Sequence, residues 1–299
     1  MILGLGSILE NEPPEVISSK GQALVEKARK FLSTVPRSGR LKDKVCIITG
    51  IGKTEKGIGF ATAVAYAHAG AKHLYLLDLV KRPLDGCKAI IAERYPDVKV
   101  TTIEGDAADE TTISGLCNHV LKEERRLDVF FANAGISYGS ELHHITTEMW
   151  LNTMRINTLS VFLATKYGST AMMKTDPTVG KEASSGSIIL TASIAGLRAC
   201  GGPVECWSDF LPLFFLCWKL ILWLNTDSAS KAAVISVAQT ASYQLARTNI
   251  RINAICPGLI ETDMTQIFWD QAHKQNLTVP ALATLNPLMR QGASEGTIC

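Results

Sequence analysis

A glycine-rich run between the first predicted strand and the first predicted helix could bind a diphosphate. It reads Thr49-Gly50-Ile51-Gly52-Lys53-Thr54-Glu55-Lys56-Gly57-Ile58-Gly59. Glycines let the backbone turn tightly and approach a pyrophosphate, which rests on the amide groups and the positive dipole end of the helix that follows. An ordinary glycine-rich turn is the alternative, so the run indicates a nucleotide site only with support from its surroundings.

Gly52-Lys53-Thr54 also resembles a P-loop, but that motif needs a glycine five residues before Gly52, and Ile47 occupies that position. Asp78 favours a dinucleotide instead. It closes the second predicted strand about 20 residues past the glycines, where a carboxylate binds the adenosine ribose hydroxyls; a strand-end turn former is the alternative. A carboxylate there repels a 2′-phosphate, so we expect NAD. NADP is left open because four cations could offset the repulsion: Lys53, Lys56, Lys81 and Arg82.

The elements that must position these residues alternate along the chain. Short apolar runs predict strands at 45–49, 74–78, 98–104, 127–132, 187–191 and 250–255. Longer helical patterns occupy 58–69, 82–94, 110–124, 146–174 and 228–246. This alternation is typical of βαβ units, and nearly all-apolar strands need helices on both faces. We therefore predict a Rossmann-type, doubly wound parallel sheet in a three-layer α/β/α arrangement.

We expect one domain over residues 41–299, preceded by an appendage over residues 1–40 that carries a short helix at 17–32. After Met264 the alternation fades, so the sheet is predicted to stop at six strands. No repeat of 20 to 50 residues is visible along the chain. The dinucleotide site and the chemistry therefore share one folding unit.

Composition indicates a small-molecule partner. The 30 basic and 28 acidic residues give a formal net charge of +2, which argues against a nucleic acid or an anionic membrane as partner. Eight cysteines without CxxC pairs indicate reduced thiols rather than disulfides or a metal site. The first residues lack a basic secretory n-region, so we expect a cytoplasmic protein.

Further motifs follow the glycine run in order. They are Asp106, Asn133-Ala134-Gly135, Asn157, Ser193, Ser228-Ala229-Ser230-Lys231 and Pro257-Gly258-Leu259-Ile260-Glu261-Thr262. Together with the glycine run they resemble the short-chain dehydrogenase/reductase family over residues 41–264. Ordered motifs at suitable spacings are much more specific than any one of them. The resemblance implies a usually oligomeric oxidoreductase that moves hydride between a nicotinamide coenzyme and a small alcohol or ketone.

The resemblance also implies where the cofactor lies. The residues that would hold its pyrophosphate are Gly50, Gly57, Ile58 and Gly59. Asp106 would meet the adenine. The middle of the cofactor would be lined by Asn133, Ala134, Gly135 and Lys231, and the nicotinamide side would be closed by Pro257, Gly258, Ile260 and Thr262. One departure is clear, because the family usually has three residues between its first two glycines and six separate Gly50 from Gly57.

In this family a tyrosine donates or accepts the substrate's proton. A lysine four residues later lies on the same helix face, and its ammonium lowers the tyrosine pKa. A serine hydroxyl bonds the substrate oxygen. By resemblance Ser193 and Lys231 match the serine and the lysine, and Asn157 matches a residue that supports a proton-relay water. Taken alone, each has a simpler interpretation: a loop cap for Ser193, a solvated charge for Lys231 and a helix kink for Asn157.

Asp227 stands four residues before Lys231, where the tyrosine is expected. Reference pKa values of about 4 and about 10 differ by roughly 6 units, or about 8 kcal/mol of proton affinity. We expect Lys231 to lower the carboxyl pKa further, and the shorter side chain not to reach the position of a phenol oxygen. The sequence therefore predicts an impaired oxidoreductase. A catalytically dead dinucleotide-binding sensor or scaffold is the alternative.

An unusual apolar segment, residues 206–226, precedes Asp227 and contains three of the five tryptophans. Its apolar core, residues 213–224, is too short to span a bilayer and carries Lys219. A membrane-associated protein that uses this segment as a surface loop is one interpretation. It predicts lipid partitioning that disappears when the segment is deleted.

We favour an unspliced intron as the origin of this segment. An intron after the first base of a tyrosine codon would give cysteine at its start and aspartate at its end, as at Cys206 and Asp227. Removing it places a tyrosine directly before Ser228-Ala229-Ser230-Lys231 and 13 residues after Ser193, as the family pattern expects. We therefore predict TGT at Cys206 and ACA followed by GAT or GAC at Thr226 and Asp227. TGC at Cys206 would exclude this splice.

The C-terminal part is short for the family, which normally adds a strand and a helix that shape the substrate pocket and the subunit contacts. We expect a second fault of the gene model there. Without these elements the sixth strand would be an exposed edge. A homo-oligomer, expected for the intact family fold, is therefore in doubt for this chain.

Overall fold

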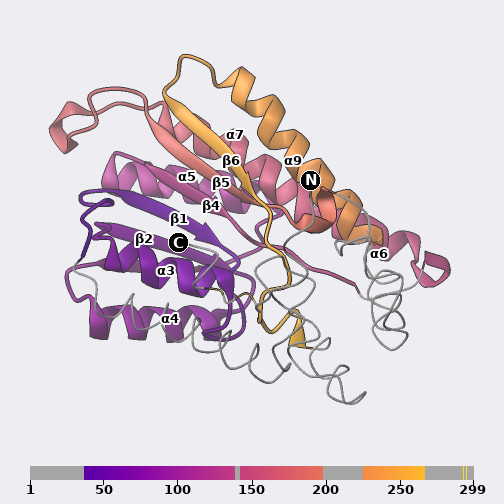
Figure 1. Cartoon of the computed structure of the whole chain (residues 1–299). Coiled ribbons are helices and arrows are strands. Elements are labelled where there is room, and N and C mark those ends of the chain that lie inside the picture. Colours follow the sequence, from indigo (N-terminus) through magenta and orange to yellow (C-terminus); the bar gives the residue numbers. More distant parts are fainter. Residues whose placement is uncertain (1–36, 139–141, 198–224, 267–291, 293, 295–299) are drawn as a thin grey trace, which may run out of the picture.

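The computed structural model describes residues 37–138, 142–197, 225–266, 292 and 294 (Figure 1). The predicted helix at 17–32 and residues 206–224 of the apolar segment lie outside these ranges, whereas residues 225–226 begin a helix. Within the described ranges, no helix combines the length and the hydropathy needed to cross a bilayer.

Six parallel strands form one sheet in the order β3-β2-β1-β4-β5-β6. Their bounds are Val45–Thr49 (β1), His73–Asp78 (β2), Lys99–Glu104 (β3), Val129–Ala132 (β4), Gly186–Thr191 (β5) and Ile250–Ile255 (β6). The chain builds outward from β1 to β3, returns to place β4 beside β1, and then builds outward to β6. This reversal confirms the predicted doubly wound α/β fold. It puts the topological switch point, where such folds bind ligands, between β1 and β4.

Helices cover both faces of the sheet, as Figure 1 shows. On one face lie α3 (Ile58–His68) and α4 (Lys81–Arg94), and on the other lie α5 (Glu110–Glu124), α7 (Ser160–Met172) and α9 (Asn225–Gln244). The remaining helical elements are α6 (Thr147–Met154), η1 (Leu142–His144), η2 (Arg155–Leu159), η3 (Pro177–Val179) and η4 (Ile194–Gly196). The predicted three-layer arrangement is confirmed.

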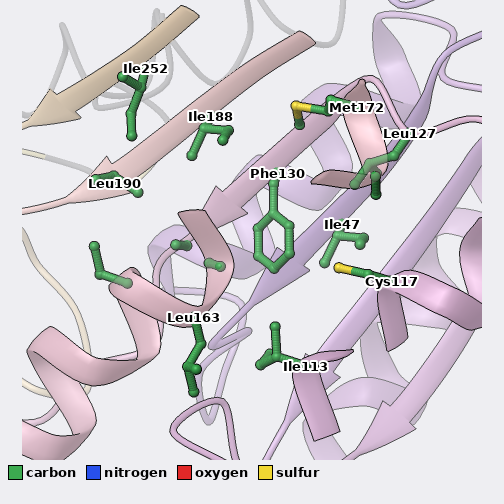
Figure 2. Close-up of a cluster of buried hydrophobic side chains, with 14 of the residues drawn as sticks. Ile47, Ile113, Cys117, Leu127, Phe130, Leu163, Met172, Ile188, Leu190 and Ile252 are labelled. Atoms are coloured by element: carbon green, nitrogen blue, oxygen red, sulfur yellow. The ribbon is translucent and has the colours of Figure 1, made fainter. Parts of the chain in front are cut away.

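The two faces of β1 carry separate cores because successive side chains of a strand point to opposite faces. Val45 and Ile47 join the cluster under α5, α7 and α9, which Figure 2 shows around Phe130. Cys46 and Ile48 join the second cluster, under α3 and α4. Every residue of β1 is buried. A parallel strand covered on both faces must be apolar throughout, which is why the central strands could be predicted from sequence.

The predicted helix at 146–174 was wrong in one respect, because it is divided into α6, the π-helical turn η2 and α7. The Thr146 hydroxyl accepts a hydrogen bond from the Met149 amide at 3.1 Å and caps α6. A π turn spaces its backbone hydrogen bonds by five residues and often occurs at functional sites. Apolar periodicity gives no sign of it. The other predicted elements differ from the structure by a few residues at their ends.

Candidate active site

The glycine loop, residues 50–57 between β1 and α3, lies at the carboxyl end of β1. Gly50 has φ +70 and Gly52 has φ +95, a region that favours glycine. A Cβ on Gly50 would lie 2.5 Å from the Ala134 Cα, and one on Gly59 would lie 2.1 Å from the Gly50 carbonyl oxygen. These close approaches leave a cradle lined by backbone. Gly57 precedes α3 without a side-chain cap. The Phe60 amide donates to the Ile51 carbonyl at 3.0 Å, so the amides of Ile58 and Gly59 at the start of the helix are the ones that could face an anion.

Asn133 and Thr49 hold this loop against the neighbouring strands. The Asn133 Nδ2 donates to the Gly50 carbonyl at 2.6 Å, and its Oδ1 accepts from the Thr191 hydroxyl at 3.0 Å. The Thr49 Oγ1 accepts from the amides of Asn133 and Ala134 at 3.2 and 3.3 Å. Asn133 therefore joins the ends of β1, β4 and β5, a structural task that its predicted position along the cofactor did not indicate.

Asp78 lies where the sequence places it, beside the glycine loop. Its Oδ2 accepts from the Gly52 amide at 3.1 Å, and its Oδ1 accepts from the Val80 amide at 3.2 Å. The turn-forming interpretation and the cofactor-site interpretation are therefore compatible, because one oxygen serves the turn after β2 and the other faces the loop. The carboxylate stays half-buried at the end of β2.

Asp106 has a partner that sequence reasoning missed. Its Oδ1 accepts from the Ala108 amide at 2.8 Å, and its Oδ2 accepts from the Arg155 guanidinium at 2.7 Å. Arg155 begins η2, 49 residues along the chain. No motif connects the two positions, so only the packing of η2 beside the loop after β3 reveals the pair.

Asn157 is fully buried in η2 and joins several predicted site residues. Its Oδ1 accepts from the Ile136 amide at 2.8 Å. Its Nδ2 lies 2.9 Å from the Ile136 carbonyl oxygen, 2.9 Å from the Ser230 Oγ and 3.3 Å from Asp227 Oδ1. Three acceptors thus share two amide hydrogens. The π turn gives Asn157 this position. The helix-kink interpretation is therefore right for its backbone, but its side chain also connects η2 with α9.

Lys231 is 8 % exposed, so the solvated-charge interpretation is wrong. Its Nζ donates to the Thr191 carbonyl at 2.9 Å, and a Cβ on Gly135 would lie 3.4 Å from that Nζ. Burial lowers the pKa of Lys231, because a poorly solvated ammonium is less stable than the amine. The structure therefore brings Lys231, Gly135 and Asn157 together at the ends of β4 and β5.

The expectation that Lys231 lowers the pKa of Asp227 was wrong in its net direction. Asp227 is also 8 % exposed, and burial raises the pKa of its carboxyl group more than the attraction of Lys231 lowers it. Desolvation dominates because both charges lie on the buried face of α9. The carboxyl group approaches Asn157 and is held inside this cluster.

Ser193 caps η4, as the simpler interpretation states. Its Oγ accepts from the Ala195 amide at 3.1 Å, while the Ile194 amide donates to the Pro257 carbonyl at 3.1 Å. Ser193 thereby lies between β5 and the segment after β6, residues 257–265, which we call the post-β6 segment. Gly258 faces Ile194, and Thr262 is buried. Ile260 pairs with Gly292 in an isolated bridge.

One grouping among the described residues could in principle hold a metal ion, and it lies away from this site. It consists of His73, Glu123 and Glu124, whose ligand atoms lie within 4.8 Å of one another. Lys72 pairs with Glu124 at 2.7 Å, and Lys99 pairs with Glu123. The two ammonium groups balance both carboxylates, so the cluster needs no cation.

Comparison with known proteins agrees with this geometry. The short chain dehydrogenase family matches residues 44–204, and the enoyl-(acyl carrier protein) reductase family matches residues 224–295. Levodione reductase of Leifsonia aquatica is 30% identical over 256 residues, which cover 85% of this chain and 84% of that protein. A 3-oxoacyl-(acyl-carrier-protein) reductase of Thermotoga maritima is 31% identical and covers 80% of this chain and 83% of its own.

Solved structures show the same fold. The crystal structure of levodione reductase aligns with a TM-score of 0.69 at 29% identity and covers 86% of this chain and 88% of that one. Xylitol dehydrogenase with NAD+ bound aligns with a TM-score of 0.67 at 24% identity, over 86% of this chain and 89% of that one. The sequence match and the fold agree, and the chain therefore belongs to the short-chain dehydrogenase/reductase family of NAD(P)-dependent oxidoreductases.

Proposed function

We propose that this domain binds NAD in preference to NADP, and that its site is built for hydride transfer involving a small alcohol or ketone. We further propose that proton transfer is impaired in the chain as written. The observation that carries the proposal is the convergence of the backbone cradle at Gly50 and Gly59 with buried Asn157 and Lys231 at one end of the sheet. Bound coenzyme would supply or accept the hydride.

The residues fit a dinucleotide in two ways. The cradle has no room for a Cβ at Gly50, Gly57 or Gly59, as expected where backbone amides approach a diphosphate. Lys231 can donate three hydrogen bonds, and within the described residues one goes to the Thr191 carbonyl. Its other hydrogens can be donated to the hydroxyls of a coenzyme ribose that lies between the glycine loop and the end of β5.

The preference for NAD rests on Asp78. An anion that contacts the glycine loop through the Gly52 amide repels a 2′-phosphate. Two of the cations that could offset it have other acidic neighbours: Lys56 pairs with Glu261 at 2.7 Å, and Lys81 lies 3.9 Å from Asp85. Calorimetric titration with NADH and NADPH tests this preference. Asp78→Asn should raise the NADPH affinity by about tenfold, whereas Asp85→Asn removes an equal charge nearby and should leave the preference for NADH in place.

The impairment rests on Asp227. A general acid must reach the atom that it protonates and must hold a proton at the working pH. The Asp227 carboxyl group is buried against Asn157 at 3.3 Å and shares its helix face with Lys231. It is therefore committed to the interior cluster. A phenol at this position would extend further from α9 toward the end of β5 and Ser193.

A repaired chain tests the impairment directly. Residues 206–227 are replaced by one tyrosine, and a matched variant carries one phenylalanine instead. We expect all three chains to bind NADH and only the tyrosine form to turn over members of an alcohol and ketone panel. Turnover by the natural form or the phenylalanine form equal to that of the tyrosine form would contradict the proposed role of the phenol. Sequencing the gene tests the splice origin separately, because TGC at Cys206 excludes it.

A coenzyme-binding pseudoenzyme is the second candidate. The mutual contacts of Asn157, Ser230 and Asp227 favour it, because they give this chain a folded interior without tyrosine. Such a protein would bind NADH with no turnover in the natural form and none in the tyrosine form. Turnover in the tyrosine form alone would instead identify a disabled enzyme.

We also propose a homodimer through the helix that contains η2. Leu151, Leu159 and Phe162 are 61%, 37% and 49% exposed, and they recur at spacings that place them along one side of α6, η2 and α7. Exposed apolar side chains that gather on one side of a helix mark candidate protein–protein contacts. Light scattering of the full chain should show a dimer, and Phe162→Glu should shift it toward the monomer. A monomeric wild type would contradict the proposal.

A further inference from the structure

The glycine loop is longer than its family pattern, and the structure shows where the extra residues point. Thr54 Oγ1 donates to Asp263 Oδ2 at 2.9 Å, and Lys56 Nζ donates to Glu261 Oε1 at 2.7 Å. The partners are 209 and 205 residues apart in the sequence. Both contacts connect the glycine loop to the post-β6 segment. A shorter loop would lack the residues that make them.

Each side of this connection is also anchored elsewhere. The Lys56 amide donates to Thr54 Oγ1 at 3.2 Å, which fixes the turn that carries both side chains. The Lys56 carbonyl accepts from the buried Ser294 hydroxyl. In the post-β6 segment, the Glu261 amide donates to the Gly292 carbonyl at 2.9 Å. The two contacts therefore join two segments that already have a defined shape.

The role of this connection depends on the proposed function, on which the inference rests. The glycine loop carries the diphosphate cradle, and the post-β6 segment begins beside Ser193 and η4, at the end where hydride transfer is proposed. With the diphosphate on the glycine loop and the nicotinamide beside Ser193, contacts between the two segments would span the site between them. A dinucleotide that enters or leaves would then pass the boundary that these contacts close.

We propose that Thr54 and Lys56 are positioning residues, which fasten the post-β6 segment over the dinucleotide and slow its release. Their partners are Asp263 and Glu261. The Lys56 and Glu261 side chains are 47% and 35% exposed, so the contribution is modest. An exposed ion pair changes an equilibrium by up to about five-fold, and salt weakens it.

The test measures NADH release from the full-length chain by stopped-flow fluorescence. Lys56→Gln and Glu261→Gln should each raise the dissociation rate by about two- to five-fold, and the double variant should add little more, because both remove one contact. Lys53→Gln is the matched control. It removes the same charge from the same exposed loop, so any general loss of attraction for the phosphates appears in it as well. The charge-reversed pair Lys56→Glu with Glu261→Lys should restore slow release.

A second measurement needs no coenzyme. Hydrogen exchange of the free protein should be faster across residues 259–266 in Lys56→Gln than in Lys53→Gln, because only the first loses a contact with that segment. Equal exchange in the two variants, or equal NADH release, would overturn the inference while the proposed function stands. A wild-type chain that binds neither NADH nor NADPH would overturn the proposed function and, with it, the role assigned to these contacts.

Discussion

At the amino-terminal end of the sheet, the buried carboxylate of Asp128 accepts two hydrogen bonds from Arg126 at 2.8 Å and one from the Val45 amide at 2.9 Å. Lys181, whose side chain is fully buried, donates to the Leu127 and Ser185 carbonyls and lies 3.7 Å from Asp128. Both buried cations of this cluster therefore lie beside the same buried carboxylate. Such a cluster stabilises the fold and offers little to a ligand.

At the carboxyl-terminal end, the buried charges are matched less completely. Within the described part of the chain, Lys231 Nζ donates one hydrogen bond, to a neutral carbonyl. Asp227 accepts from Asn157 at the long distance of 3.3 Å. Equal burial thus has a different meaning at the two ends, because unmet hydrogen-bonding capacity is what a ligand can satisfy. The incompletely paired end is the one that carries the glycine cradle.

The largest expected effect comes from disrupting the charge cluster around Asp128. Asp128→Ala leaves Arg126 and Lys181 buried without their counter-ion, and should lower the free energy of unfolding by about 3–5 kcal/mol. The NADH affinity of the molecules that remain folded should be unchanged. Urea unfolding and calorimetric titration measure the two quantities. A loss below about 1 kcal/mol would show that this cluster is not fully desolvated.

The next effect concerns the cradle. Gly59→Ala would place a Cβ 2.1 Å from the Gly50 carbonyl oxygen, so the loop must move. We expect a loss of about 1–3 kcal/mol of stability, together with at least a tenfold loss of NADH affinity, since the loop amides would no longer face the proposed position of the diphosphate. Gly115→Ala is the control. Its Cβ would meet nothing within 4 Å in α5, and it should stabilise the protein by about 0.5–1 kcal/mol. If Gly59→Ala bound NADH with wild-type affinity, the glycine loop would not be part of the coenzyme site.

Lys231→Met should lower the NADH affinity with little effect on stability, the reverse of what is expected for Asp128→Ala. Removing this buried ammonium relieves its desolvation but also removes its attraction for the buried Asp227 carboxyl group. The two changes oppose each other, so the free energy of unfolding should change by less than about 1 kcal/mol. NADH affinity should fall by about tenfold, because the hydrogen bonds that we propose between Lys231 and the ribose would be lost. Thermal unfolding and titration distinguish the two changes. A strongly destabilised variant with intact NADH affinity would make Lys231 a structural residue like Lys181.

The smallest effect is a pH dependence at the amino-terminal end. The His73 Nδ1 lies 2.8 Å from Glu124 Oε1, and its Nε2 lies 2.8 Å from the Thr101 hydroxyl. Because a carboxylate can only accept, we assign Nδ1 as the donor and Nε2 of the neutral imidazole as the acceptor. Burial lowers the pKa of His73. The unfolded chain, with a histidine pKa of about 6.5, therefore takes up a proton first as the pH falls. The free energy of unfolding should be highest above about pH 6.5 and should decrease below it.

His73→Gln tests this dependence, because it removes the buried titrating group. The slope of unfolding free energy against pH, measured between about pH 7 and 5.5, should be smaller in His73→Gln than in the wild type. His119→Gln removes a histidine from the exposed side of α5 and is the control. If both variants flatten the slope equally, the buried imidazole is not its source.

Much of the fold could be predicted because its signals are local. The apolar runs of β1 and β4 and the helical spacing on α9 gave those elements to within a few residues. The glycine run and Asp78 also lie where they were expected, since a strand-turn-helix unit fixes both. The division of the helix at 146–174 could not be predicted, because a π turn leaves the apolar pattern almost unchanged.

Local patterns were enough to predict the order of strands and helices along the chain, the glycine loop, and the residue types at the end of the sheet. Packing set their neighbours: Arg155 beside Asp106, Lys56 beside Glu261, and Asn157 against α9. It also decided the direction of the Asp227 pKa, which the neighbouring lysine suggested wrongly. The reason is physical. Backbone conformation depends on nearby residues, whereas desolvation and charge pairing depend on what the rest of the chain places within a few ångströms.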